Sequence, residues 1–237
     1  MSEKKAEFDH LSESYEQLLA DPIRDRFTAG DSQFFHTRKR DLIRAFFKRR
    51  GTDTRKLNYL DLGCGKGELL TLLREDFGRV SGCDPSAGMM ESGGLAEKGI
   101  TTRVQDDPGI IPYDDSSFDF ATAVCVYHHV PPSERDRLTA EVRRVLKPGG
   151  LFAIIEHNPY NPATRIIVSR TPVDADAILL THGETRGLLK RSGFNVDYSE
   201  YFLYLPEKLY ERAGVLESAF KWLPFGGQYA VFGSRRG

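Results

Sequence analysis

The sequence predicts an α/β protein with a seven-stranded, mostly parallel sheet, helices on both faces of the sheet and an N-terminal helical cap. Two observations carry this prediction. From Asn58 onward, short apolar runs alternate with helical patterns, which is the βαβ signal of a parallel sheet. The first of these apolar runs leads into three alternating glycines and then into the helical run 69–73. A strand, a glycine turn and a helix in direct succession place a ligand at the carboxyl end of a sheet strand.

The remaining elements follow from apolar periodicity and turn residues. We expect strands at 58–62, 79–83, 100–105, 118–126, 151–156, 194–203 and 229–233. Helices are expected near 86–91, from Pro131 to about residue 146, and from the capping-box sequence at Thr181 to Gly193. Residues 147–150 indicate a turn before the fifth strand, and 158–162, with two Asn-Pro steps, indicate a loop.

Residues 1–52 are expected to form the helical cap, and residues 53–237 the domain that carries the sheet. Asp21-Pro22 fits a capping residue followed by proline at the first helical position. A longer helix is expected at about 33–50. Its basic residues, Arg38, Lys39, Arg40, Arg44, Lys48, Arg49 and Arg50, are typical of a solvated face, although such a face also suits an acidic substrate or nucleic acid.

The glycine turn has the pattern Asp-x-Gly-x-Gly-x-Gly over residues 61–67. Glycines permit backbone angles closed to other residues and let a ligand touch the main chain. The helix that follows offers unpaired N–H groups and a positive dipole end. A phosphate-binding P-loop would need Ser or Thr after Lys66, where Gly67 stands, and a dinucleotide fingerprint would need glycine at Glu68.

The pattern of the turn resembles motif I of class I S-adenosylmethionine (SAM)-dependent methyltransferases. Residues 114–119 are similar to that family's turn into strand four, 125–130 to the segment after strand four, and 146–150 to the start of strand five. This order resembles the methyltransferase type 11 group, near the ubiquinone/menaquinone-biosynthesis methyltransferases, and covers residues 55–157 well. The resemblance implies a Rossmann-like class I methyltransferase fold, SAM as cofactor, and S-adenosylhomocysteine as product.

Several side chains outside the turn are expected to contact the cofactor. Asp84 ends the second strand, where an acidic group can accept both ribose hydroxyls or can simply form a turn. The resemblance implies that the Asp107 carboxylate meets the adenine amino group and that Tyr15 covers the cofactor, unless it is an ordinary core residue. The predicted cofactor-binding residues are Asp61, Gly63, Cys64, Gly65, Gly67, Asp84, Pro85, Met89, Asp107, Pro108, Cys125 and Tyr15.

Catalytic residues are expected just past strands four and five, beside the cofactor. The methyl group of a sulfonium is already electrophilic, so the protein mainly aligns a nucleophile and excludes water. A base is needed only where the acceptor must lose a proton, and histidine suits that task. We expect His128 or His129 to be the base or substrate orienter, with Glu156 and His157 in the pocket wall. Tyr127 is a further catalytic candidate. Each histidine could equally be structural, and the spacing predicts no metal site.

The composition of the chain limits the kinds of partner that we expect for it. The chain has 237 residues, a net charge of −1 and three cysteines without C-x-x-C spacing, which argues against nucleic-acid or membrane steering, a disulfide framework and a zinc site. No apolar run reaches the length of a membrane span, and the first residues do not resemble a secretory signal. We therefore expect a cytoplasmic protein with a small-molecule substrate and no nucleic-acid or membrane partner.

Two functions fit these observations. The first is a SAM-dependent methyltransferase acting on oxygen, nitrogen or carbon of a metabolite, and the second is a SAM-binding protein of the same fold without methyl transfer. The Asn-Pro-aromatic segment of many amino-group methyltransferases is absent after strand four, and Val124 precedes Cys125 where cytosine-5 methyltransferases have proline. Residues 206–226 are expected to form a helix-bearing excursion, either an apolar lid over a small molecule or a homodimer surface.

Overall fold

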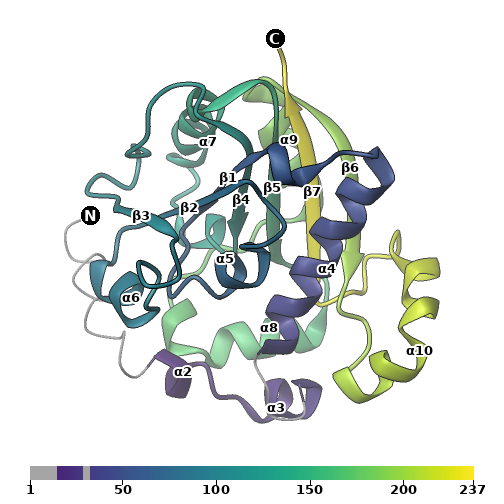
Figure 1. Cartoon of the computed structure of the whole chain (residues 1–237). Helices are drawn as coiled ribbons and strands as arrows, with labels where there is room; N and C mark the ends of the chain where they lie inside the picture. Colours follow the sequence, from purple (N-terminus) through teal and green to yellow (C-terminus); the bar gives the residue numbers. More distant parts are fainter. Residues whose placement is uncertain (1–14, 29–32) are drawn as a thin grey trace.

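The computed structural model describes residues 15–28 and 33–237, and it has a seven-stranded sheet in the order β3-β2-β1-β4-β5-β7-β6 (Figure 1). Strand β7 runs antiparallel to both of its neighbours, whereas the other pairs are parallel. The strands are β1 (Asn58–Leu62), β2 (Arg79–Asp84), β3 (Thr101–Val104), β4 (Phe118–Val124), β5 (Leu146–His157), β6 (Phe194–Phe202) and β7 (Gln228–Arg235). The predicted mostly parallel sheet is confirmed.

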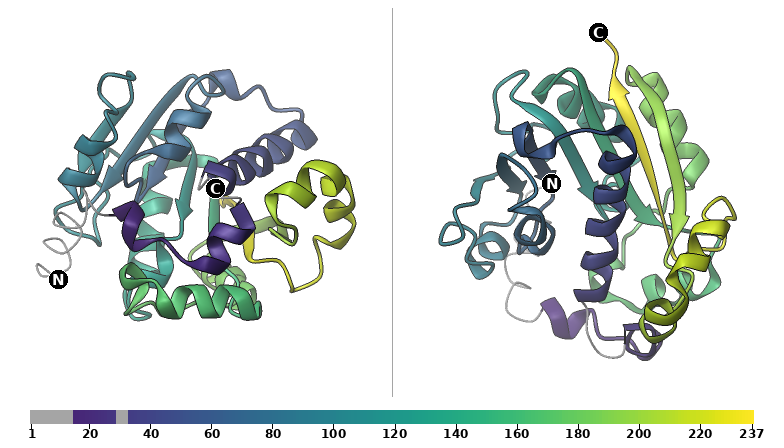
Figure 2. Two further views of the ribbon diagram at one scale, coloured as in Figure 1. Left: turned by 90° about the horizontal axis from the view of Figure 1, so that it is seen from below. Right: turned by 45° about the vertical axis from the view of Figure 1, so that its right-hand side comes forward.

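Helices precede the sheet, connect its strands and lie on both of its faces (Figure 2). The α-helices are α2 (Tyr15–Leu18), α3 (Pro22–Thr28), α4 (Gln33–Arg50), α5 (Glu68–Leu73), α6 (Ala87–Ser92), α7 (Arg135–Val145), α8 (Pro162–Arg170), α9 (His182–Arg191) and α10 (Glu207–Phe220). Short 3-10 helices are η1 (Thr54–Lys56), η2 (Tyr127–His129) and η3 (Pro172–Asp174).

The period-two alternation of the strands divides the apolar side chains between two cores. Tyr59 and Phe120 face α4 and α5, and they pack there with Phe47. Their neighbours along the strands, Leu60 and Ala121, face the opposite way, toward α7 and α9. Because α4 lies in the first of these cores, the segment predicted as a cap is continuous with the sheet through packed side chains.

Asn or Asp followed by Pro starts a helix at two places. The Asp21 carboxylate accepts the N–H of Ile23 at 2.8 Å, which confirms the predicted start of α3. Likewise, Asn161 accepts the N–H of Thr164 at 2.9 Å, and Pro162 is the first residue of α8. The prediction of a loop at 158–162 missed this helix because the same Asn-Pro signal fits both a turn and a helix start.

The fifth strand begins earlier than predicted. Strand β5 starts at Leu146, which pairs with Phe118, so the prediction of a turn at 147–150 was wrong. The register shifts before the next pair, Phe120 with Leu151, and Gly149 within this irregular stretch has a φ of +76°. The glycines thus form a bulge near the start of a continuous strand. A local break in register accommodates the extra residues.

A buried ion pair joins α10 to α4. Arg38 donates to the Glu217 carboxylate at 2.5 Å, and both side chains are less than a tenth exposed. The second Glu217 oxygen accepts the N–H of Tyr204 at 2.6 Å, while the guanidinium carbon lies 3.5 Å from the ring centre of Tyr210. The prediction of a solvated basic face is therefore wrong for Arg38, which holds the C-terminal excursion against the body of the protein.

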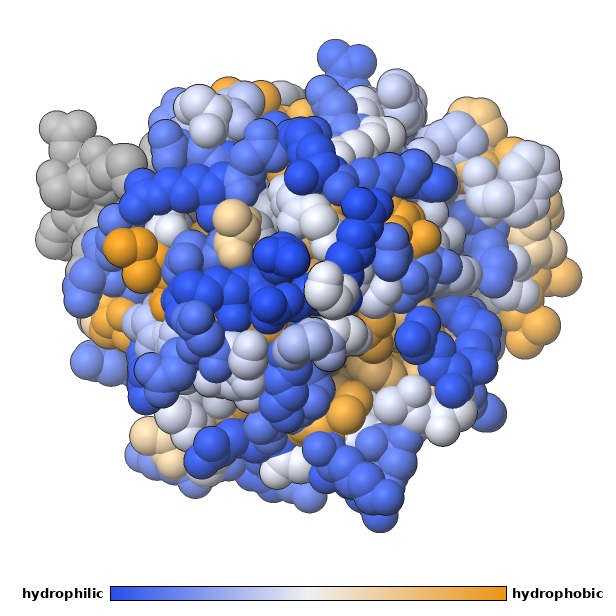
Figure 3. All heavy atoms as spheres, turned by 90° about the horizontal axis from the view of Figure 1, so that it is seen from above, coloured by the Kyte–Doolittle hydropathy of each residue, from blue (hydrophilic) through white to orange (hydrophobic). Residues whose placement is uncertain are grey.

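Large apolar side chains remain exposed on and after α10. They are Leu209, Val215, Leu216, Phe220, Trp222 and Phe225. Figure 3 shows hydrophobic atoms gathered at its right-hand edge, on the side where Figure 1 places α10. The two interpretations of 206–226, a lid and a dimer surface, stay predictions. Within the residues that the structure describes, every helix is too short or too polar to cross a bilayer.

We expect Glu217→Ala to lower the free energy of unfolding by about 3–5 kcal/mol, because it leaves the Arg38 charge buried without its partner. Urea unfolding followed by circular dichroism measures this loss. Glu75→Ala removes an ion pair with Arg74 at an exposed position, and it should change stability by less than about 0.5 kcal/mol. Equal effects of the two substitutions would show that the buried pair does not anchor α10.

Candidate functional site

The glycine turn lies at the carboxyl end of β1 and leads into α5. Gly63, Gly65 and Gly67 all have positive φ angles, of +66°, +51° and +71°. A Cβ on Gly67 would lie 2.4 Å from a methyl carbon of Leu95, whereas a Cβ on Gly65 would meet only Met89, at 3.6 Å. Gly65 therefore combines a backbone conformation that favours glycine with open space for a ligand.

Asp84 holds the turn in place. One of its carboxylate oxygens accepts the N–H of Gly65 at 2.8 Å, and the other accepts the N–H of Ser86 at 2.8 Å. The sequence allowed Asp84 either a ribose contact or a turn-forming role, and these hydrogen bonds give it the turn-forming role. They also join the end of β2 to the glycine turn after β1. Contact with ribose hydroxyls stays a prediction, as does the cofactor role of Pro85, which follows directly. Cys64, the remaining residue of the predicted turn, is buried beneath it.

Asp61 has a buried carboxyl group two residues before the turn. It accepts a hydrogen bond from the Thr122 hydroxyl at 2.5 Å, and the Tyr59 hydroxyl lies 2.7 Å from the same Thr122 oxygen. Burial raises the pKa of Asp61 to about 7, while the hydrogen bond from Thr122 and the charge of Lys39 act in the opposite direction. A cationic group bound nearby would favour the ionised carboxylate.

Lys39 is a functional candidate that the sequence-based interpretation missed. The side chain comes from the middle of α4 and is 5% exposed. Its charge opposes the rise that burial causes in the pKa values of Asp61 and Cys125, and it adds to the fall that burial causes in the pKa of His157, so the ammonium lies near the carboxyl ends of β1, β4 and β5. Within the described part of the chain, Lys39 has neither a hydrogen bond nor an ion pair. The sequence does contain a signal for this burial. Lys39 precedes the core residue Ile43 by one helical turn, so both lie on the same face of the helix.

Asp107, expected at the adenine, lies in the loop after β3. Its carboxylate accepts the N–H of Gly109 at 2.8 Å and pairs with Arg137 at 3.1 Å, and both partners of the ion pair are about half exposed. The carbonyl of Pro108 accepts a hydrogen bond from the Gln105 amide. Both contacts order this loop, and the adenine role stays a prediction. Tyr15 begins α2, but its side chain lies outside the described residues.

Cys125 ends β4 in a conformation that is rare for its residue type. It has a φ of +56°, and its N–H donates to the carbonyl of Ile155 at 2.8 Å. This backbone explains why β4 stops at Val124 and not at residue 126, as predicted. Left-handed non-glycine residues cluster at functional sites. Burial raises the pKa of the Cys125 thiol, so a reactive thiolate is disfavoured here.

His128 lies between two carboxylates at this end of the sheet. Its Nδ1 atom is 2.6 Å from a Glu156 oxygen, and its Nε2 atom is 3.3 Å from Asp174. The other Glu156 oxygen accepts the N–H of Tyr127 at 2.7 Å. Burial opposes the charged imidazolium, but the two carboxylates outweigh it and hold the pKa of His128 well above its usual range. This geometry favours the orienting role over the base role, because each ring nitrogen faces a carboxylate.

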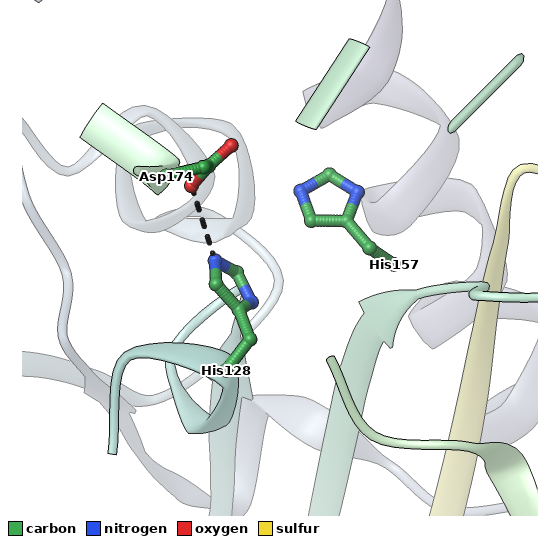
Figure 4. Close-up of side chains that lie close together, drawn as sticks. All are labelled: His128, His157 and Asp174. Atoms are coloured by element: carbon green, nitrogen blue, oxygen red, sulfur yellow. Dashed lines mark ion pairs between the residues drawn. The ribbon is translucent and has the colours of Figure 1, made fainter. Parts of the chain in front are cut away.

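Two further histidines adjoin His128, and Figure 4 shows one of them, His157. The Nε2 atom of His129 is 3.5 Å from Asp174, and the ring centre of His157 is 5.2 Å from that of His128. Burial, followed by the charge of His128, lowers the pKa values of His129 and His157 to about 4. Both rings are therefore neutral near pH 7 and can accept a hydrogen bond.

The structure places two residues differently from the sequence-based assignment. Tyr127, a predicted catalytic residue, lies in the core, and Asp174, which was not predicted, lies beside the histidines. The Tyr127 ring is fully buried, and its hydroxyl pairs with Thr139 of α7 at 2.9 Å, so the expected catalytic position of this phenol is not supported. Asp174 was not predicted, yet η3 carries it to the histidines. No sequence signal identified it, because a loop acidic residue becomes part of a site only through the path of the chain.

The chain matches a family model described as a methyltransferase domain over residues 60–154. An uncharacterized methyltransferase of Synechocystis is 30% identical over 144 residues, which cover 58% of this chain and 66% of that protein. A demethylmenaquinone methyltransferase of Lactobacillus johnsonii is 34% identical over 119 residues, covering 45% and 47%. A sterol 4-C-methyltransferase of Caenorhabditis elegans is 33% identical over 110 residues, covering 43% and 32%. The chain thus spans less than two thirds of the length of each of these relatives.

Solved structures of the same fold extend the match over most of the chain. A SAM-dependent methyltransferase from Archaeoglobus fulgidus superposes with a TM-score of 0.61 at 19% identity, covering 86% of this chain and 100% of that one. The PH0226 protein from Pyrococcus horikoshii gives 0.61 at 20% identity, covering 90% and 96%. At these identities the likeness establishes the fold, which is the predicted Rossmann-like methyltransferase fold.

We expect Gly65→Val to abolish SAM binding in calorimetry, because the side chain would occupy the open space beside the turn. Gly99→Val is the matched control, since Gly99 has a φ of +72° and a Cβ added there would meet no atom within 4 Å. Each variant should lose about 1–2 kcal/mol of stability from the left-handed backbone, and circular dichroism melts measure that loss. Normal SAM binding by a folded Gly65→Val protein would place the cofactor elsewhere.

Proposed function

Because this chain carries the SAM-binding domain of a class I methyltransferase of the type 11 group, we propose that it transfers a methyl group from SAM to a small-molecule acceptor. The observation that carries the proposal is the set of groups at this edge of the sheet. They are the open glycine turn, the ammonium of Lys39, which has no partner within the described residues, and the histidines at the carboxyl ends of β4 and β5. The names of two relatives, a demethylmenaquinone and a sterol methyltransferase, support a small-molecule acceptor.

The charges around the turn are complementary to the amino-acid part of SAM. That part carries one ammonium and one carboxylate. The protein offers one buried carboxyl, Asp61, just before the turn and one buried ammonium, Lys39, from α4. Asp61 would hold the SAM ammonium, and Lys39 would hold the SAM carboxylate. The main chain at Gly65 would lie against the cofactor, with Asp84 at the ribose. Each buried charge would then have a partner, as buried charges require.

The protein's part in the reaction is mainly alignment. Bound SAM supplies an electrophilic methyl group, so the acceptor atom must be held in line with it and water must be kept out. The neutral rings of His129, which follows β4, and His157, which ends β5, can orient an acceptor by hydrogen bonding. Acceptor oxygen, nitrogen or carbon are all compatible with this arrangement.

The proposed activity is tested with SAM that carries a deuterated methyl group. The protein and this SAM are incubated with a metabolite extract, and mass spectrometry is used to search for products that carry the label. We expect labelled products and S-adenosylhomocysteine to appear together, and both to be missing with the folded Gly65→Val protein. SAM binding without label transfer from any extract would instead support a binding protein of the same fold.

The role of Lys39 is tested by comparing two ligands. We expect Lys39→Met to weaken SAM binding about 10- to 150-fold, the worth of one hydrogen bond to a charged group. Binding of 5′-methylthioadenosine, which lacks the carboxylate, should stay within about twofold of wild type. Lys48→Met, at an exposed position of the same helix, should leave both affinities unchanged. Equal losses for both ligands would mean that Lys39 acts on the turn and not on the carboxylate.

A further inference from the structure

Three side chains from separate parts of the chain converge beyond the carboxyl ends of β4 and β5. His128 belongs to η2, His157 is the last residue of β5, and Asp174 is the last residue of η3. One nitrogen or oxygen atom from each of them lies within 4.8 Å of the other two. Figure 4 shows the two rings and the carboxylate turned toward a common centre. We call this group the His–Asp cluster.

The contact between Asp174 and His128 is long for a hydrogen bond between charged groups and suits two ligands of one metal ion. Asp174 lies 3.3 Å from Nε2 of His128, and this buried nitrogen has no hydrogen-bond partner of normal geometry within the described residues. Zinc binds imidazole nitrogen at about 2.0–2.1 Å, so two ligands of a tetrahedral ion lie about 3.4 Å apart. The distance from Asp174 to His128 therefore already matches that between two ligands of one ion.

A second carboxylate orients the central ring from behind. Glu156 is fully buried, and its carboxylate accepts a hydrogen bond from Nδ1 of His128. The opposite ring nitrogen, Nε2, therefore faces Asp174. Histidine ligands of metal ions almost always donate their other ring N–H to a carboxylate or carbonyl in this manner. The two carboxylates also carry the charge that compensates a divalent cation.

We propose that the His–Asp cluster binds one divalent transition-metal ion of the zinc type, with His128, His157 and Asp174 as its protein ligands. Two imidazoles and a carboxylate suit such an ion, and hard cations such as Mg²⁺ prefer an all-oxygen set. Three protein ligands leave a coordination position open, as in catalytic sites and unlike closed structural ones. Neighbouring His129 is not among the three residues whose ligand atoms converge.

The open position gives the ion a part in the reaction, and this step rests on the proposed methyl transfer. An acceptor hydroxyl bound there would lose its proton to solvent more readily, because a bound cation lowers the pKa of an attached oxygen. The ionised oxygen would then form a bond to the methyl carbon as the bond from that carbon to sulfur breaks, leaving neutral S-adenosylhomocysteine. The ion replaces a protein base, which agrees with the engagement of both nitrogens of His128.

Metal binding is measured directly, without SAM or acceptor. Protein freed of any affinity tag is dialysed against chelator, and Zn²⁺ is titrated by calorimetry while elemental analysis gives the bound stoichiometry. We expect about one ion per chain, bound far more tightly than Mg²⁺. Co²⁺ in the same site should give the visible absorption of a low-coordinate ion, which a surface-bound ion would not.

Variants locate the ion within the His–Asp cluster. We expect Asp174→Asn and His157→Gln to weaken Zn²⁺ binding by at least about 100-fold, and Glu156→Gln by about 10- to 100-fold. His182→Gln is the control, because this histidine packs on Tyr201 outside the cluster. Circular dichroism melts identify any variant that fails to fold.

Two outcomes overturn the metal site. Absence of stoichiometric Zn²⁺ binding by wild-type protein would show that Asp174 and Glu156 simply share a protonated His128. Undiminished binding by folded Asp174→Asn and His157→Gln would place the ion elsewhere. Both outcomes are independent of the proposed methyl transfer, because SAM affinity is measured separately on the metal-free protein.

Discussion

Parallel strands end at one edge of a sheet, and this geometric constraint organises the protein. Strands β1, β2, β4 and β5 are all parallel, so their carboxyl ends bring the glycine turn, Asp84, Cys125 and His157 to the same edge. Helices on both faces bury the sheet beneath this edge, and the connecting loops carry the polar groups above it. A site assembled from distant segments is therefore a direct consequence of the strand order.

Buried charges form a second layer of organisation around this edge. Arg38 and Glu217 neutralise one another and join α10 to α4. One residue further along α4, Lys39 is buried as well, but it has no partner within the described residues and faces the edge of the sheet. Buried ions without partners are costly. Arg38 and Lys39 are therefore adjacent in α4 but differ in role. Arg38 holds the fold together, and Lys39 offers a charge to a ligand.

The polar groups after β4 and β5 differ in kind from those at the glycine turn. At the turn, the open space beside Gly65 and the buried carboxyl of Asp61 suit a flexible, zwitterionic ligand, while Asp84 holds the main chain in place. Beyond β5, two carboxylates and three imidazoles lie within a few ångströms, and Glu156 fixes the orientation of His128 from the core. The proposed acceptor would lie between these two environments, with the methyl group delivered from one side and its own polar atom held on the other.

The sequence by itself determined the elements whose signals are local. Apolar alternation identified the strands, and the glycine spacing identified the turn, because period and turn chemistry depend only on neighbouring residues. The tertiary structure alone decided the burial of Lys39, the burial of Tyr127 in the core and the recruitment of Asp174. Each of these depends on packing or on loop paths that join residues far apart in the chain, and residue type and spacing do not encode such distances.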